Sequence, residues 1–317
     1  MSDSSAVLTG VKGSAFDEQQ LREDARTLVE SVAVGADQLE EQAERRWRAH
    51  LRFLRERPAF VLAVVTLLLA LAWAVAPSLF TSWDPIDGVP RDRLSPPGDG
   101  HLFGTDQLGR DLYARIVYGA GQSLAATAGA VGVGLVLGSG LGLLAGSARG
   151  WVDDVIMRIV DVLLSIPSLL LSLALITALG FGTINVAIAV GLASVASFAR
   201  IMRSEVLRVG GAEYVEAARV SGVSWWGVLI RHILPNSAGP VIALSALEFG
   251  QAVLAISALS FLGFGAPPPA PEWGALVSGG RDYLATAWWL ITFPGLVIAA
   301  VVLAANQVAR TFERPER

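Results

Sequence analysis

The chain has 317 residues, of which 53% are hydrophobic and 16% are charged. Soluble proteins carry about 25% charged residues, so the apolar excess indicates a protein that lies in a membrane. The net charge of −4 offers no basic surface for nucleic acid, and the absence of cysteine excludes disulfides, thiolate metal sites and cysteine nucleophiles. The polar first 58 residues do not fit a cleavable signal peptide, whose apolar run begins near its start.

Residues 1–57 are predicted to form a cytoplasmic extension that is partly helical, because 17–57 are rich in helix-forming residues. A helix needs about 20 apolar residues to cross a bilayer. The segments that meet or approach this length are 59–80, 121–148, 159–179, 183–199, 238–263 and 285–309. Six such segments in one chain are not expected of a soluble protein. We therefore predict an all-α, polytopic membrane protein with six transmembrane helices.

The distribution of basic residues predicts the orientation of the chain in the membrane. With the N-terminus inside, 19 of the 24 Lys and Arg residues fall on the cytoplasmic side. Since basic residues concentrate on that side, both termini are predicted to be cytoplasmic. The resulting divisions are a first span with an outer loop (58–120), a five-helix core (121–310) with a cytoplasmic loop at 200–237, and a cytoplasmic tail (311–317).

The second apolar segment contains six glycines between residues 132 and 146. Glycine-rich nucleotide-binding motifs require a preceding strand and access to water, and an apolar helix offers neither. The glycines instead predict close packing of one helix against another.

The loop at 200–237 contains the pattern that bears most directly on function. Residues 213–220 favour a helix, and Gly222 suits the left-handed conformation that ends one. Ser224 can cap a second helix that follows, and Pro235 is expected where the chain bends into the fifth span. The result is a short helix across the cytoplasmic face of the membrane, whose small alanines let another protein approach closely.

The same loop resembles the cytoplasmic loop of bacterial ABC importer permeases. The matching residues are Glu216, Ala217, Ala218, Gly222, Leu234 and Pro235. The general pattern has Ile where this chain has His232, and the sequence of residues 231–236 resembles that of the peptide/nickel subfamily. Residues 101–111 and 259–274 resemble the C-type subunit of dipeptide and oligopeptide permeases.

The resemblance implies a type I ABC importer permease whose short cytoplasmic helix couples it to an ATPase. The coupling residues implied are Glu213, Glu216, Ala217, Ala218, Arg219, Gly222, Leu234 and Pro235. The implied partners are a homologous second permease subunit, two cytoplasmic ATPase subunits that hold ATP and Mg, and an extracytoplasmic binding protein that delivers a peptide substrate. The location implied is the inner membrane of a bacterium.

The chain itself is not expected to be an enzyme. A phosphate-binding loop needs a lysine within a Gly-Lys-Ser/Thr motif, and the single lysine, Lys12, does not stand in one. No cofactor or metal site is expected in this chain.

Three residues are candidates for the substrate path. Glu248 is an ionisable residue within a predicted span, where such residues are functional candidates, and Gln251 and Asn185 could line a cavity or hold helices together. Residues 104–111 and 267–273 could form the outer rim that meets the binding protein, or be structural turns. A nickel or metal-chelate permease subunit remains the alternative within the family. Outside it, a secondary transporter or channel would leave the 213–235 loop unexplained.

Overall fold

The computed structural model describes residues 57–98, 100–148 and 150–312. Residues 1–56, which hold the predicted N-terminal helix, and residues 313–317 lie outside the described part. The described residues from 59 onward make up one compact unit. All regular structure in the described part is helical, apart from two isolated β-bridges near one end.

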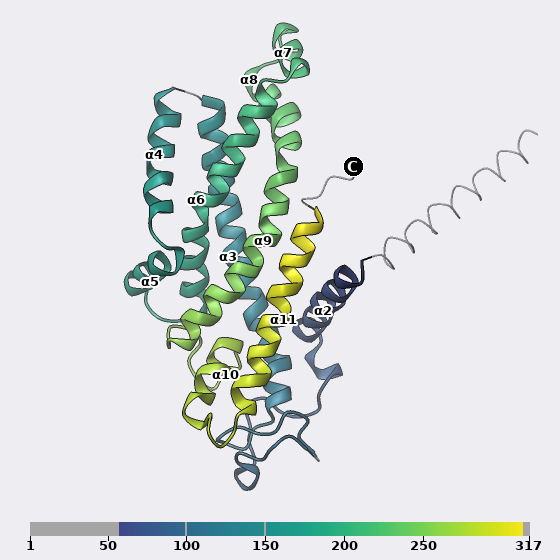
Figure 1. Cartoon of the computed structure of the whole chain (residues 1–317). Coiled ribbons are helices and arrows are strands. Elements are labelled where there is room, and N and C mark those ends of the chain that lie inside the picture. Colours follow the sequence, from purple (N-terminus) through teal and green to yellow (C-terminus); the bar gives the residue numbers. More distant parts are fainter. Residues whose placement is uncertain (1–56, 99, 149, 313–317) are drawn as a thin grey trace, which may run out of the picture. The chain divides into compact units, whose positions relative to one another are not determined.

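Long apolar helices dominate the fold (Figure 1). They are α2 (Pro58–Val75), α3 (Leu112–Ala148), α6 (Thr183–Gly210), α9 (Leu234–Phe261) and α11 (Trp289–Phe312). Within the described residues, five helical segments are long and apolar enough to cross a membrane, and a bent pair adds a sixth if it counts as one span. The predicted all-α polytopic fold is confirmed.

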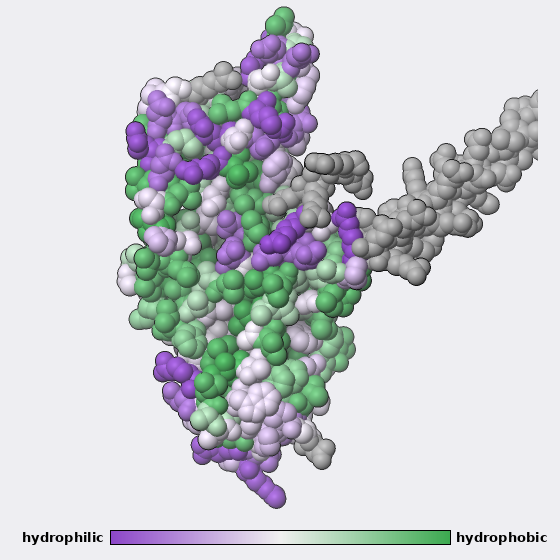
Figure 2. Space-filling view, in the orientation of Figure 1, coloured by the Kyte–Doolittle hydropathy of each residue, from purple (hydrophilic) through white to green (hydrophobic). Residues whose placement is uncertain are grey.

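Shorter elements lie at the two ends of the bundle (Figure 1). The helix α7 (Glu213–Val220) and the single-turn α8 (Trp225–Val228) lie at one end, called here the α7 end. Residues 81–111 and α10 (Trp273–Gly280) lie at the opposite end, called here the loop end. Figure 2 shows hydrophilic surface towards both ends and a mostly hydrophobic belt between them, as expected of a membrane-spanning unit.

The third predicted span is not a continuous helix, which corrects the expectation for residues 159–179. It is split into α4 (Trp151–Ser165) and α5 (Ser168–Leu179), which meet at an angle of 99°. Ile166 between them is extended, with φ −95° and ψ 129°. The proline that follows it disfavours helical backbone at the preceding residue and lacks the amide that would continue the helix.

The helix α6 is longer than predicted and runs 28 residues to Gly210, through the first part of the expected cytoplasmic loop. An ion pair ties its final turns to α4. The guanidinium of Arg203 donates to both carboxylate oxygens of Asp153, at 2.5 and 2.6 Å. The predicted loop is thus mostly helix, and only the short segment around α7 leaves the bundle.

Glycines on α3 bring it into close contact with α6. A Cβ added at any of four of them would lie less than 3.0 Å from an atom of α6; these are Gly134, Gly138, Gly142 and Gly146. They recur every fourth residue and so share one face of the helix. Gly132 and Gly140 face elsewhere, and no atom lies within 4 Å of an added Cβ. The predicted packing role is confirmed for the four that face α6.

The helix α10 is built into the loop end by its first residues. Trp273 is fully buried, and its indole nitrogen donates to the carbonyl of Ile116 on α3 at 2.9 Å. The carboxylate of Glu272 is also fully buried and accepts from the amides of Gly274 and Ala275, both at 3.0 Å. It thereby satisfies two of the amides that a helix N-terminus leaves without partners.

Candidate functional site

The helix α7 stands between the end of α6 and the start of α8 (Figure 1). The amide of Val223 donates to the carbonyl of Ala218 at 3.1 Å, and that of Gly222 donates to Arg219 at 3.0 Å. Gly222 has a φ of +81°. This pairing is a Schellman motif, whose left-handed position suits glycine because it has no Cβ. The predicted helix over 213–220 and its glycine stop are confirmed.

One face of α7 is held by the bundle and the other is open. Val215 is fully buried in an apolar cluster with residues of α6, α8 and the turn that follows α8. Ala218 packs against the same cluster, whereas Ala217 and Glu216 are exposed. The two alanines therefore serve different faces: Ala218 lets α7 approach its own bundle, and Ala217 leaves the open face shallow.

The open face of α7 has charges at its rim. Glu213, Glu216 and Arg219 are exposed, and none of them forms an ion pair with another described residue. Exposed charges cost little to leave in water and remain available to a complementary surface.

Apolar side chains around α7 were not anticipated from the sequence. Val220 is 90% exposed, and Tyr214 is about half exposed. Trp225 and Trp226 are also exposed, and their rings meet edge to face with centroids 4.6 Å apart. Aromatic residues are enriched at protein interfaces. The signal that could have revealed them is an aromatic pair directly after a helix stop, in a segment expected to face water.

Pro235 lies inside an unbroken helix rather than at a turn into the fifth span, contrary to expectation, and Leu234 is the first residue of α9. Helical backbone runs without a break from Trp225 to Phe261, and this stretch is long and apolar enough to cross a membrane. A π-helical turn at Leu229–Ile233 precedes Pro235. Its wider hydrogen-bonding pattern accommodates the proline, which has no amide hydrogen to donate to the helix. The predicted cap at Ser224 is confirmed, since its hydroxyl accepts from the amide of Gly227 at 3.3 Å.

The three candidates for a substrate path are not gathered in one place. Glu248 is half-buried on α9 within hydrogen-bonding reach of Ser197 on α6, and Gln251 is exposed nearly one turn further along α9. Asn185 lies at the loop end of α6, where its amide donates to the carbonyls of Leu179 at 3.0 Å and Phe181 at 3.3 Å. Asn185 thus holds the turn between α5 and α6.

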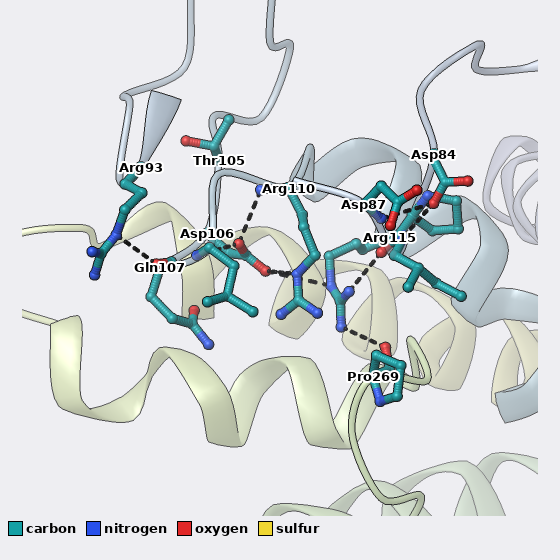
Figure 3. A network of polar contacts seen from close by, with 12 residues as sticks. Asp84, Asp87, Arg93, Thr105, Asp106, Gln107, Arg110, Arg115 and Pro269 are labelled. Atoms are coloured by element: carbon teal, nitrogen blue, oxygen red, sulfur yellow. Dashed lines mark hydrogen bonds and ion pairs between the residues drawn. The ribbon is translucent and has the colours of Figure 1, made fainter. Parts of the chain in front are cut away.

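A polar network at the loop end joins residues 81–111 to the rest of the chain (Figure 3). The carboxylate of Asp106 accepts from the amides of Leu108 and Arg110, at 2.8 and 3.0 Å, and from the Nε of Arg110 at 2.7 Å. Arg115 on α3 donates to the carbonyls of Pro85 at 2.6 Å and Pro269 at 3.3 Å. The segments at 104–111 and 267–273 are therefore brought together.

The chain is similar to several permease proteins over most of its length. It is 38% identical over 262 residues to the dipeptide transport system permease protein DppC of Alkalihalophilus pseudofirmus, a match that covers 83% of this chain and 86% of that protein. It is 41% identical to the glutathione transport system permease protein GsiD of Pectobacterium atrosepticum, with 82% and 85% covered. The di/tripeptide transport system permease protein DppC of Pseudomonas aeruginosa is 39% identical, with 78% and 82% covered.

The fold is similar to that of a solved structure described as a crystal structure of an amino acid ABC transporter with histidines. The TM-score is 0.50 at 18% sequence identity, and the match covers 64% of this chain and 94% of that one. Residues 138–315 match the family described as binding-protein-dependent transport system inner membrane component. The chain therefore belongs to this family and is a membrane-spanning permease subunit of an ATP-binding cassette importer, a transport protein rather than an enzyme.

Proposed function

We propose that this chain is one of two homologous permease subunits in an importer of short peptides. The names of its relatives support this substrate class, because dipeptides, tripeptides and the tripeptide glutathione share a free carboxylate, an ammonium group and peptide bonds. Two cytoplasmic ATPase subunits hold ATP and Mg, and an extracytoplasmic binding protein delivers the peptide.

The α7 end lies in the cytoplasm in this proposal, and the loop end lies outside the inner membrane of the bacterium. This orientation is supported by the basic residues, most of which fall in the segments that it assigns to the cytoplasm, together with both termini.

The open face of α7 is the site where the ATPase acts. The observation that carries this proposal is that α7 is anchored through Val215, while Glu216, Ala217 and Val220 remain exposed. The charges of Glu213 and Arg219 flank the contact, and Gly222 fixes where α7 ends. Leu234 and Pro235 lie in the helix that carries motion from α8 into α9.

Helices on both sides of α7 connect it directly to the bundle, so a movement of α7 would be passed on to them. The helix α6 leads into α7 and packs against α3 through the glycine face, and the continuous helix from Trp225 leads out of it into α9. When the ATPase subunits close and displace α7, two rigid units would therefore move. One is α6 together with α3, and the other is α9. This is alternating access, in which nucleotide selects between two states of the bundle.

Glu248 and Gln251 are proposed to face the peptide path on α9. A carboxyl group at this depth is costly against lipid and is tolerated where it meets water, a polar partner or a polar substrate. Gln251 is exposed on the single chain, so a second subunit or the path itself must cover it.

The test is the ATPase activity of the assembled complex in lipid, stimulated by binding protein loaded with a tripeptide. Glu216→Lys reverses a charge on the open face, and Gly222→Pro removes the left-handed stop of α7. Both are expected to lower stimulated activity at least about tenfold, the effect of 1.4 kcal/mol of lost coupling.

The matched control for these variants is Asp154→Lys, a charge reversal at an exposed residue of α4, away from both α7 and the loop end. It should retain stimulation, and all variants should insert into the membrane normally. Stimulation that survives both α7 substitutions would remove the coupling role. If nickel-loaded binding protein stimulated the ATPase activity and tripeptide-loaded binding protein did not, the substrate would be nickel rather than a peptide.

A further inference from the structure

A pocket at the loop end lies where residues 106–115 meet residues from the span 266–290. Its volume is about 410 Å³, and its walls come from residues 106–115, the proline-rich turn 266–270, α10 and Leu290 of α11. Most of the wall is apolar, including Leu108, Leu276 and the prolines at 268 and 269. The volume falls within the range of about 300–1,000 Å³ that is typical of ligand pockets.

Three ionisable side chains line the pocket: Asp106, Arg110 and Arg115. Their side chains are only 6–7% exposed. Asp106 pairs with Arg110, whereas its nearest oxygen lies 3.7 Å from the Nε of Arg115. The pocket wall thus carries two positive charges against one negative charge, and burial makes such an excess costly.

Donor groups of both arginines lack acceptors within the described residues. The Nε of Arg115 is buried without a hydrogen-bond partner. Arg110 uses only its Nε, and its two terminal nitrogens make no hydrogen bond (Figure 3). The neighbouring Asp84 forms no ion pair with either arginine in the described part of the chain, and its carboxylate accepts from the amides of Ile86 and Asp87. A buried guanidinium with spare donors is suited to a carboxylate, which it can bind in a forked geometry.

The pocket is built into the backbone around it. A Cβ at Gly88 would lie 2.3 Å from the carbonyl oxygen of Leu108, and one at Gly109 would lie 1.9 Å from that of Val89. Two chain segments therefore meet at contact distance directly behind Arg110. Arg115 in turn links the segment at Pro85 to the turn at Pro269. Arginines held in this way lose little freedom when they bind a partner.

We propose that this pocket receives an aspartate or glutamate side chain of the extracytoplasmic binding protein. The inference rests on the proposed function, which places the loop end outside the membrane. The charges are complementary, because one carboxylate would balance the excess positive charge and could accept from the free nitrogens of Arg110. The apolar walls would exclude water from that contact, so that the contact chiefly slows dissociation of the docked protein.

The test uses the assembled complex in lipid nanodiscs, with its tripeptide-loaded binding protein in solution. Arg110→Gln should raise the dissociation constant about 30-fold or more, mainly through the dissociation rate. Arg110→Lys keeps the charge but loses the fork, and should recover part of the affinity. The matched control is Arg91→Gln, which removes one charge from an exposed position in the same loop and should alter only the association rate.

A second arm does not depend on how the permease variant folds. Exposed acidic residues of the binding protein are changed one at a time to their amides and tested against the unaltered complex. One of them should reproduce the loss, and it should add little further loss when combined with Arg110→Gln, as a double-mutant cycle requires for a direct pair.

The outcomes separate the pocket from the proposed function. Normal docking to Arg110→Gln, or the absence of any acidic residue that couples to it, would overturn the pocket alone. A loss that appears with tripeptides carrying a free carboxylate but not with amidated ones would assign the pocket to the peptide terminus and overturn this inference. If the unaltered complex failed to bind any loaded binding protein, the proposed function would fall, and the inference with it.

Discussion

The contact between α3 and α6 can be tested by adding one methyl group to a glycine. In Gly138→Ala the new Cβ would lie 2.5 Å from the carbonyl oxygen of Val195 and 2.5 Å from the Cβ of Phe198. Ordinary contacts begin at 3.4 Å, so the two helices would have to separate by about 0.9 Å. Overpacking of this kind costs about 1–3 kcal/mol. The better helix propensity of alanine offsets up to about 1 kcal/mol of this overpacking cost.

Gly140→Ala is the matched control, since it makes the same chemical change two residues away on the same helix. No atom lies within 4 Å of its added Cβ, so only the propensity gain remains. The two variants should therefore differ by about 1–3 kcal/mol, and Gly138→Ala should melt lower.

The assay is thermal unfolding of both variants in the same detergent, followed by tryptophan fluorescence. For chains of about 150–250 residues, 1 kcal/mol corresponds to about 2–4 °C in Tm, and the shift for this longer chain should lie at or below the lower end of that range. Equal melting temperatures for the two variants would refute the argument that the glycine face sets the distance between α3 and α6.

Three further outcomes are expected. Gly222→Ala should lower peptide-stimulated ATPase activity severalfold, because left-handed backbone with a Cβ costs about 1–2 kcal/mol, whereas Gly211→Ala, at an ordinary φ of −94°, should not. Asp153→Asn should destabilise the chain by about 1–2 kcal/mol through loss of its forked ion pair to α6, while Asp154→Asn, on exposed surface, should change the Tm little. Burial raises the pKa of the Glu272 carboxyl above its ordinary value of 4.5, so the folded state keeps this proton to a higher pH than the unfolded state does. The free energy of unfolding should therefore fall as the pH rises from 4.5 through the raised pKa. Glu272→Gln has no such proton and should flatten this part of a Tm–pH profile.

Local features of the fold could be predicted from the sequence because they depend on nearby residues. The lengths of the apolar segments predicted the long helices, apart from the broken third span, and the break at Gly222 followed from the preference of glycine for left-handed backbone. The cap at Ser224 is likewise a contact with an amide three residues away. These features need no knowledge of the rest of the fold.

Features that depend on distant contacts could not be predicted. The 99° angle between α4 and α5 is set by what each packs against, although the proline between them marked the place. Pro235 shows the opposite error, because a proline that predicted a bend is accommodated by a π-helical turn. The excess charge at Arg110 and Arg115 appears only when residues 85, 106 and 269 come together.

The π-helical turn at Leu229–Ile233 has a consequence for chains of this fold that differ in length there. Such a turn holds one residue more than an α-helical turn, and each residue rotates a helix by about 100°. Deleting one residue from it would shorten the helix by only about 1.5 Å. Yet every side chain of α9, Glu248 and Gln251 included, would point in a different direction relative to α8. A single-codon deletion could thereby redirect the whole face of α9 without changing any residue on it.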